Sequence, residues 1–311
     1  MRKAYATTSL IPAMLIMAAF LGLAVLIEAS DNSTVNFGAN SNITAFTTCK
    51  KVTNGSATGL SVYVPTQTSA EWTSFYTNPP AGVTAGGCTC TTPTYTGVHF
   101  DTAGSGAASP QGITWNGTYF WIADFSDSRI YRYNANGTYS GFSFSTAGAG
   151  AGNISSITWN GTYFWVTDFL DDEVYRFNAN GTYSGFSFDT AASGNTRPYG
   201  ITWDGTYFWI MNDSTGRVYR HNANGGYSGY SFSTSAYYGI VWDGAYFWVT
   251  NPNGSLTGGT VYRYNANGTY SGFSFSTTAS GNGWPNGIVW DGTYLWVVDV
   301  TDAEVYKYGC S

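Results

Sequence analysis

Five acidic or amide residues recur at the same position of a repeated aromatic pattern. They are Asp124, Asp168, Asn212, Asn251 and Asp299. Five such groups around one axis could hold a cation, since hard cations bind carboxylate and amide oxygens. A polar side chain that returns in every repeat more often caps its own loop, as Asp and Asn readily do. We therefore expect loop caps at these positions, and no metal or cofactor.

Groupings of residues that could carry out catalysis are scarce. The sequence has only two histidines, His99 and His221, and neither stands in a pattern with Ser and Asp or with metal ligands. Paired carboxylates can cleave glycosidic bonds, but the acids here belong to the repeats or to loops, and no single pair stands out. On these grounds we expect that the chain is not an enzyme.

The connections between the repeats carry the candidate ligand-binding residues. The repeats are nearly constant in sequence, whereas their connections differ from one repeat to the next. Positions that vary on one common face are free to acquire a function, although drift in unconstrained loops would produce the same variation. The aromatic and amide residues that would suit a saccharide or a partner protein are Tyr199, Tyr237, Tyr238, Trp284 and Asn286.

Sequons for N-glycosylation, Asn-x-Ser/Thr, are dense in this chain. They begin at Asn32, Asn42, Asn54, Asn116, Asn136, Asn153, Asn160, Asn180, Asn212, Asn253 and Asn267. Those in Asn-Gly-Thr turns can serve hairpin geometry alone, an explanation that does not apply to Asn32, Asn42, Asn54 and Asn153. In a secreted chain this density predicts a surface coated with glycans.

A tryptophan motif defines the repeat that must position these residues. The motif Trp-Asn/Asp-Gly-Thr/Ala-Tyr-Phe/Leu-Trp begins at Trp115, Trp159, Trp203, Trp242 and Trp290, which gives spacings of 44, 44, 39 and 48 residues. Each unit divides into four short strands, with Asn-Gly or Asp-Gly turns, which suit tight hairpins, after the first strand and Asn-Gly turns after the third. In the first unit the expected strands are 112–115, 119–123, 129–133 and 139–144. A period of about 40 to 50 residues made of short strands is typical of propeller blades.

The fifth unit ends after its third strand, and an earlier segment supplies the fourth. Residues 95–102 match residues 183–190, which form a fourth strand in the second unit. We therefore expect strand 95–100 to complete the last blade, so that five blades close without an open sheet edge. The predicted fold is mainly β: a five-bladed β-propeller with an N-terminal hydrophobic α-helix.

The third-strand region resembles a known repeat family. Residues 124–133 run from an aspartate through a short polar loop to Arg129-Ile130 and an alternating strand. This pattern resembles the NHL-type repeat, and the resemblance implies a β-propeller without defining an activity. Later units depart from it, because Asp172-Glu173-Val174 and Ala303-Glu304-Val305 lack the arginine.

The N-terminal segment is apolar enough to cross a membrane. Residues 10–27 carry no charge, while Arg2 and Lys3 precede them and Glu28 follows, which places the rest of the chain outside the cell. A cleaved secretory signal, an uncleaved anchor and a filament-forming helix are the alternatives. The segment resembles the N-termini of archaeal type IV pilins and archaellins. That resemblance implies a helix that leaves the membrane and packs against its copies through Leu10, Met14, Met17, Phe20, Leu21 and Val25.

The four cysteines favour disulfides over a zinc site in an extracellular chain. Cys90 and Cys310 lie on the two sides of the hairpin that the last blade lacks, so their pairing would leave Cys49 for Cys88. Cys88 with Cys310 stays open, because four cysteines allow three connectivities.

Three regions and three candidate functions follow. We divide the chain into a helix at 1–30, a Thr/Ser/Gly-rich stalk with β-structure at 31–93 and the propeller at 94–311. The net charge of −6, from 12 Lys+Arg and 18 Asp+Glu, argues against a nucleic-acid partner. We expect a pilin-like subunit of an extracellular surface filament, a homo-oligomer built through the N-terminal helix after passage through the membrane. Its glycosylated propeller would serve adhesion or protection. The alternatives are an anchored or secreted propeller that binds surface carbohydrates, and a secreted propeller enzyme.

Overall fold

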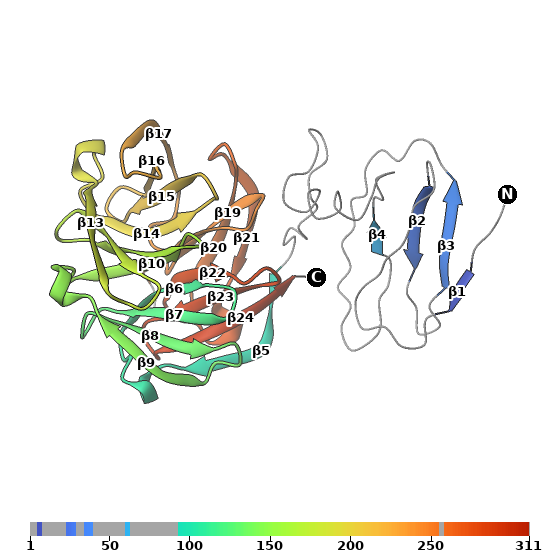
Figure 1. Ribbon diagram of the computed structural model, residues 1–311, viewed down its shortest axis with the longest axis horizontal. Helices are drawn as coiled ribbons and strands as arrows, with labels where there is room; N and C mark the ends of the chain where they lie inside the picture. Colours follow the sequence, from blue (N-terminus) through green and yellow to red (C-terminus); the bar gives the residue numbers. More distant parts are fainter. Residues whose placement is uncertain are drawn as a thin grey trace. The chain divides into compact units, whose positions relative to one another are not determined.

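The computed structural model describes residues 93–254 and 258–310, and the backbone of four strands before them (Figure 1). The chain forms two compact units, residues 1–88 and 89–311. In the first unit, β1 (Tyr5–Thr7), β2 (Leu23–Glu28), β3 (Thr34–Ala39) and β4 (Leu60–Val62) form one sheet in the order β1-β3-β2-β4. This sheet joins strands from both sides of residue 30, where the sequence suggested a boundary.

The second unit is a ring of five four-stranded antiparallel sheets, which confirms the five-bladed propeller. Blade 1 holds β6 (Pro110–Trp115), β7 (Tyr119–Asp124), β8 (Arg129–Asn134) and β9 (Tyr139–Ser145). Blade 2 holds β10 (Ile154–Trp159), β11 (Tyr163–Asp168), β12 (Glu173–Asn178) and β13 (Tyr183–Asp189). Blade 3 holds β14 (Pro198–Trp203), β15 (Tyr207–Asn212), β16 (Arg217–Asn222) and β17 (Tyr227–Ser233). Blade 4 holds β18 (Ile240–Trp242), β19 (Tyr246–Asn251), β20 (Thr260–Asn265) and β21 (Tyr270–Ser276).

Blade 5 is completed by the earliest strand of the unit, as the sequence predicted. It holds β22 (Pro285–Trp290), β23 (Tyr294–Asp299), β24 (Glu304–Cys310) and β5 (Pro93–Asp101). In the pairing of β24 with β5, Val305 lies opposite Phe100 and Tyr308 lies opposite Tyr95. The ring therefore closes through hydrogen bonds between the two ends of this unit.

Short 3-10 turns lie between most blades. They are η1 (Ala103–Ser105), η2 (Ala147–Ala149), η3 (Ala191–Ser193) and η4 (Thr278–Ser280). Each follows a fully buried threonine, and the Thr102 hydroxyl, for example, donates to the carbonyl oxygen of Ala107 at 2.7 Å. These turns fix the path from the outer strand of one blade to the inner strand of the next.

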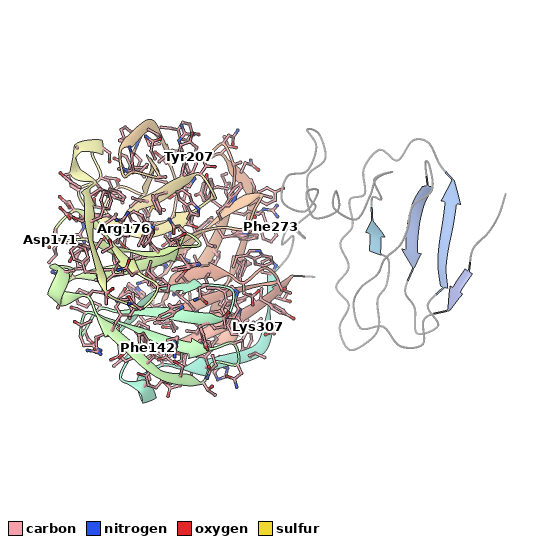
Figure 2. The ribbon with its side chains drawn as sticks, in the orientation of Figure 1. Phe142, Asp171, Arg176, Tyr207, Phe273 and Lys307 are labelled. Atoms are coloured by element: carbon pink, nitrogen blue, oxygen red, sulfur yellow. The ribbon has the colours of Figure 1, made fainter. Side chains whose placement is uncertain are left out.

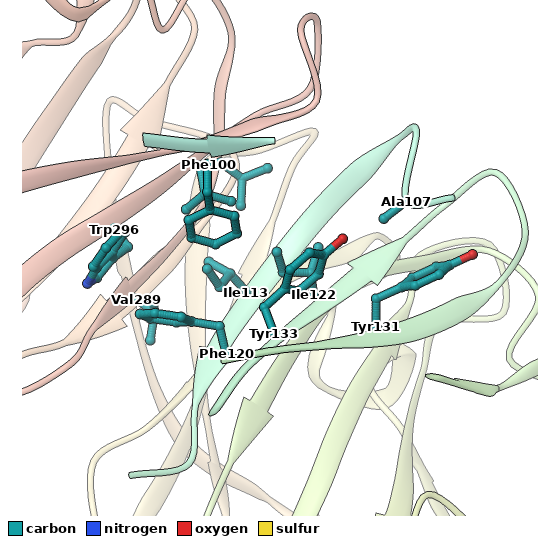
Figure 3. Packing of buried hydrophobic residues seen from close by; sticks show 11 residues of the cluster. Phe100, Ala107, Ile113, Phe120, Ile122, Tyr131, Tyr133, Val289 and Trp296 are labelled. Atoms are coloured by element: carbon teal, nitrogen blue, oxygen red, sulfur yellow. The ribbon is translucent and has the colours of Figure 1, made fainter. Parts of the chain in front are cut away.

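Aromatic side chains fill the space between neighbouring blades. At the closing interface, Phe100 from β5 packs on Phe120 of blade 1 and on Trp296 of blade 5, with ring centroids 5.9 Å apart in both cases (Figure 3). Phe100 is 9% exposed, and burying a side chain of this size contributes roughly 1.5–3 kcal/mol. The core of the propeller is therefore divided into interfaces between blades.

The cation on the third strand of each blade covers aromatic rings. The Arg176 guanidinium lies 4.6 Å from the centroids of both Tyr163 and Phe186. Lys307, which is labelled in Figure 2, takes this position in blade 5. Its Nζ lies 3.6 Å from the Tyr294 centroid. Such contacts are worth about 0.5–1 kcal/mol at exposed sites, so these residues serve the fold.

The inner strands meet closely at the axis of the ring. A Cβ on Gly239 of blade 4 would lie 2.3 Å from the carbonyl oxygen of Asn286 in blade 5. A side chain at Gly239 would therefore require the backbone of one of the two strands to move. Glycine also occupies the corresponding position in blades 1, 3 and 5, and blade 2 has Ser156 there.

The expected N-terminal helix is not shown. Residues 23–27 of the apolar run lie in β2, which pairs with β3 and β4. A short apolar run with β-branched residues such as Val25 and Ile27 fits a buried strand as well as a helix, so periodicity alone does not decide between them. Leu10, Met14, Met17, Phe20 and Leu21 lie outside the described residues. Within the described ranges, the structure contains no helix with the length and apolar character needed to span a bilayer.

The predicted disulfides also fall largely outside the described residues. Cys49, Cys88 and Cys90 are not among them, and Cys310 is described only as the last residue of β24, opposite Pro93. The pairing of Cys90 with Cys310 stays a prediction.

Candidate functional site

The candidate residues lie on one end of the ring, which we call the channel face. Because the strands of each blade are antiparallel, the second-to-third-strand loops and the connections into the next blade emerge at the same end. Tyr199, Tyr237, Tyr238, Trp284 and Asn286 all belong to these connections or to the start of an inner strand.

Tyr199 and Asn286 form a buried hydrogen-bonded group at the axis with Gln111 of blade 1. The Tyr199 hydroxyl donates to Gln111 Oε1 at 2.5 Å, and Asn286 Nδ2 donates to the same oxygen at 2.5 Å and to the Tyr199 hydroxyl oxygen at 3.0 Å. Tyr199 is 9% exposed and Asn286 is 2% exposed. These two side chains link three blades rather than offer a free surface. Asn286 Oδ1 has no partner among the described residues.

Tyr238 connects this buried group to the surface. Its ring meets the Tyr199 ring edge-to-face at 5.1 Å. Burial raises the pKa of Tyr238, and the negative charge of Asp213 raises it further. The Tyr238 hydroxyl therefore keeps its proton at neutral pH and can donate a hydrogen bond.

Tyr237, Tyr238 and Trp284 meet in one pocket. The pocket has a volume of about 360 Å³, and its walls are Asp213, Tyr237, Tyr238, Asn251, Pro252, Asn253, Gly254 and Trp284. Tyr237 and Tyr238 precede β18 of blade 4, whereas Trp284 precedes β22 of blade 5. The fold thus brings together three of the five predicted residues, from two separate connections.

Several polar side chains of the pocket walls are already hydrogen-bonded to neighbouring residues. Arg197 binds Asp213 through two parallel contacts, Nε to Oδ1 at 2.7 Å and Nη2 to Oδ2 at 2.9 Å. The hydrogen bond to Asp213 raises the pKa of Arg197. Asn251 Nδ2 donates to the Ser235 carbonyl oxygen at 2.8 Å, and Asn253 Nδ2 donates to Thr260 Oγ1 at 3.0 Å.

Three hydrogen-bonding groups in the pocket stay available to a ligand. Within residues 93–254 and 258–310, the hydroxyls of Tyr237 and Tyr238 and the indole N–H of Trp284 form no hydrogen bond. The pocket therefore combines aromatic faces and free donors with a carboxylate whose charge Arg197 balances. This combination can hold a neutral polar molecule that also has apolar faces.

The recurring acids and amides cap their loops, as expected. Asp124 Oδ1 accepts from the Ser126 N–H at 2.8 Å, and its Oδ2 accepts from the Ser109 N–H at 2.6 Å. Asp168, Asn212, Asn251 and Asp299 accept the N–H two residues ahead in the same way. These side chains hold the channel-face loops in shape.

Several pocket residues were not selected from the sequence. Asp213 occupies the loop position that holds Phe125 in blade 1 and Phe169 in blade 2. Pro252, Asn253 and Gly254 belong to the loop between β19 and β20, which is longer than the second-to-third-strand loops of the other blades. The greater length of this loop is visible in the sequence, whereas Asp213 would have been marked only by comparing these loops position by position across the blades.

The sequons differ in accessibility. The asparagines at 136, 180, 253 and 267 are exposed, and those at 116, 153 and 160 are partly exposed. Asn212 is fully buried, and its Oδ1 accepts from the N–H groups of Ser214 and Thr215, both at 3.0 Å. A glycan on Asn212 is incompatible with this fold. Asn32, Asn42 and Asn54 lie outside the described residues.

Comparison with known proteins identifies the fold alone. No family model and no curated protein matches this chain. Among solved structures, a glutaminyl cyclase from Myxococcus xanthus is similar with a TM-score of 0.56, 10% identity, and coverage of 70% of this chain and 95% of that chain. A streptogramin B lyase shows 18% identity and a TM-score of 0.41, covering 66% of each chain. An aldose sugar dehydrogenase from Streptomyces coelicolor shows 11% identity and a TM-score of 0.42, covering 65% of this chain and 94% of that chain.

These similarities correct one expectation. The expectation that the chain is not an enzyme is wrong as an inference from its fold, because the glutaminyl cyclase, which is an enzyme, shares this fold. A propeller of this kind hosts unrelated functions in its loops. The lack of a recognisable catalytic motif in the sequence therefore does not separate an enzyme from a binding protein.

Proposed function

We propose that this protein is an extracellular propeller that binds neutral carbohydrates at the pocket on its channel face. The observation that carries the proposal is the meeting of Tyr237, Tyr238 and Trp284 from two separate connections. Aromatic rings pack against the apolar C–H faces of sugars, while hydroxyl and N–H groups at their edges bind the sugar hydroxyls.

The charge of the pocket supports a neutral ligand. The one carboxylate in its walls, Asp213, is already paired with Arg197. Among the described residues that form the walls there is no lysine or arginine, so an anionic sugar would lack a direct cationic partner there. Asp213 and the amide oxygens of Asn251 and Asn253 add acceptors for sugar hydroxyl protons.

A glycan array with purified full-length protein tests the proposal. Trp284→Ala removes one aromatic wall and should weaken binding of the best array ligand by about tenfold or more, because a stacked aromatic contact carries about 0.5–1.5 kcal/mol beyond its buried area. Tyr238→Phe removes one hydroxyl and should cost less. Tyr270→Ala is the matched control, because this tyrosine is 48% exposed on the outer strand of blade 4.

The variants of the pocket and of the outer strand give opposite expected results. Array binding that Trp284→Ala abolishes and Tyr270→Ala leaves unchanged supports the proposal. Binding that all three variants retain, or a wild-type protein that binds no neutral glycan, refutes it.

The apolar N-terminal run supports a second proposal, that the protein is a subunit of a surface filament. Residues 10–27 carry no charge, so outside a membrane they need apolar partners, which copies of the same segment would supply. The propellers would then be displayed outward, with their glycans, for adhesion or protection. Electron microscopy of native material and mass spectrometry of the mature N-terminus test this idea, and a mature chain that begins near Ala29 contradicts it.

A further inference from the structure

A path of aromatic rings leads from the pocket across the channel face. The Tyr238 ring meets the Tyr199 ring at 5.1 Å, and the Tyr199 ring meets that of Phe169 at 6.2 Å. Phe169 in turn meets Phe125 at 5.9 Å between ring centroids. These residues come from the loops of blades 1 and 2 and from the connections into blades 3 and 4, so the path is a product of the fold.

The far end of this path is open to solvent. Phe125 is 38% exposed and Leu170, which follows Phe169, is 59% exposed. Phe169 is partly exposed, while Tyr199 lies beneath the surface and supports it from below. Exposed apolar side chains that adjoin a polar pocket often mark a continuation of a binding surface.

Arg197 joins the pocket to the aromatic path. Its guanidinium pairs with Asp213 of the pocket and also lies 5.4 Å from the ring centroid of Phe169. The Arg197 side chain is 44% exposed, so its N–H groups that do not bind Asp213 can reach a ligand. Because Asp213 balances its charge, this link does not require an anion.

We propose that Phe125, Phe169 and Arg197 form a second subsite, and that the ligand is an extended neutral oligosaccharide rather than a single sugar. The inference rests on the proposed carbohydrate-binding function and specifies the class of ligand that the site binds. Phe125 and Phe169 place two rings 5.9 Å apart at the solvent-exposed end of the path, and successive rings of an oligosaccharide offer repeated apolar C–H faces that can pack on them. The guanidinium can hydrogen-bond the hydroxyls of a ring that stacks on Phe169.

Calorimetric titration of the full-length protein with neutral oligosaccharides of graded length tests this inference. The probes are the cello-, chito-, malto- and manno-oligosaccharide series, each from one ring to six. We expect affinity to rise with length in the series that binds. Phe125→Ala and Phe169→Ala should each weaken binding of the longest member roughly two- to tenfold and leave the shortest binding member unchanged.

The variants need a matched control and a check of folding. Tyr183→Ala removes another exposed aromatic side chain, 39% exposed on the outer strand of blade 2, and should change neither affinity. Phe125→Ala keeps the test valid if Phe169→Ala lowers the unfolding temperature, because Phe125 is the more exposed of the two rings.

The results separate this inference from the proposed function. If affinity does not depend on length, or if both phenylalanine variants bind the longest member normally while Trp284→Ala does not, the subsite is overturned and the pocket stands. If either variant weakens short and long ligands equally, the subsite is again overturned. If the wild-type protein binds no series, both proposals fail.

Discussion

Replacing Asn116 by Asp should stabilise the propeller, because the buried indole of Trp121 lacks an acceptor that equivalent turns provide. In blade 3, Trp209 Nε1 donates to Asp204 Oδ2 at 2.6 Å, and the corresponding contacts in blades 4 and 5 measure 2.7 Å. Blades 1 and 2 have Asn116 and Asn160 at this position. There the Nε1 atoms of Trp121 and Trp165 are buried without a partner in the described part of the chain.

The geometry of the turn explains the difference. Asp204 Oδ1 accepts from the N–H groups of Thr206 and Tyr207, both at 2.7 Å. Asn116 Oδ1 accepts from Thr118 and Tyr119 in the same way, at 3.1 and 2.9 Å. Its amide nitrogen therefore occupies the place of Oδ2, where two donors face each other and no hydrogen bond forms.

The expected gain follows from the cost of a buried donor without a partner, about 1–3 kcal/mol. We expect Asn116→Asp and Asn160→Asp each to raise the free energy of unfolding by about 1–2 kcal/mol. For a domain of this size each kcal/mol corresponds to roughly 2–4 °C in unfolding temperature. The two gains should add, because the sites lie in different blades and share no partner. Denaturant and thermal unfolding at pH 7 measure both quantities.

Two controls isolate the hydrogen bond from other effects. Asp204→Asn should lose a similar amount of stability, because it recreates the mismatch in blade 3. Thr118→Val removes the sequon but keeps Asn116, so it reports any effect of a glycan. The reasoning is refuted if both aspartate variants are no more stable than the wild-type protein when all are produced without glycosylation.

Two further predictions concern buried groups of the blades. Burial lowers the pKa of His221, so the free energy of unfolding should fall as pH drops below about 6.5, where the unfolded chain takes up the proton first. His221→Phe, which places the residue found at Phe177 of blade 2, should remove this part of the pH dependence. Denaturant titrations that give the same pH profile for the variant and the wild-type protein would contradict the prediction. Gly239→Ala would place a Cβ 2.3 Å from the Asn286 carbonyl oxygen and should cost about 1–3 kcal/mol or more, measured by thermal unfolding. Gly148→Ala, whose Cβ meets no atom within 4 Å, should be neutral or slightly stabilising, and equal effects of the two changes would argue against tight packing at the axis.

The fold was predictable because its determinants are local and repeated. The five tryptophan motifs give the number of blades, and the Asn-Gly and Asp-Gly turns define the hairpins. The closing strand was also predictable, since residues 95–102 match another outer strand and the last unit lacks one. None of these features depends on side-chain contacts between residues that are far apart in the sequence.

The site was only partly predictable. Tyr199 and Asn286 were selected as surface residues, yet the structure turns both inward, because the inner strands approach so closely that side chains at their starts converge on the axis. The role of Asp213 depends on its ion pair with Arg197, which the fold creates. The apolar run at residues 10–27 has no comparable repeat to define its secondary structure, and residues 23–28 form a strand.

A structure of the full-length protein with the best ligand from the glycan array tests the central claim most directly. We predict a neutral sugar in the pocket, with one ring against Trp284 and Tyr237 and a hydroxyl bound to Tyr238. A sugar bound at the outer strands or at the opposite end of the ring, with this pocket empty, would contradict the account.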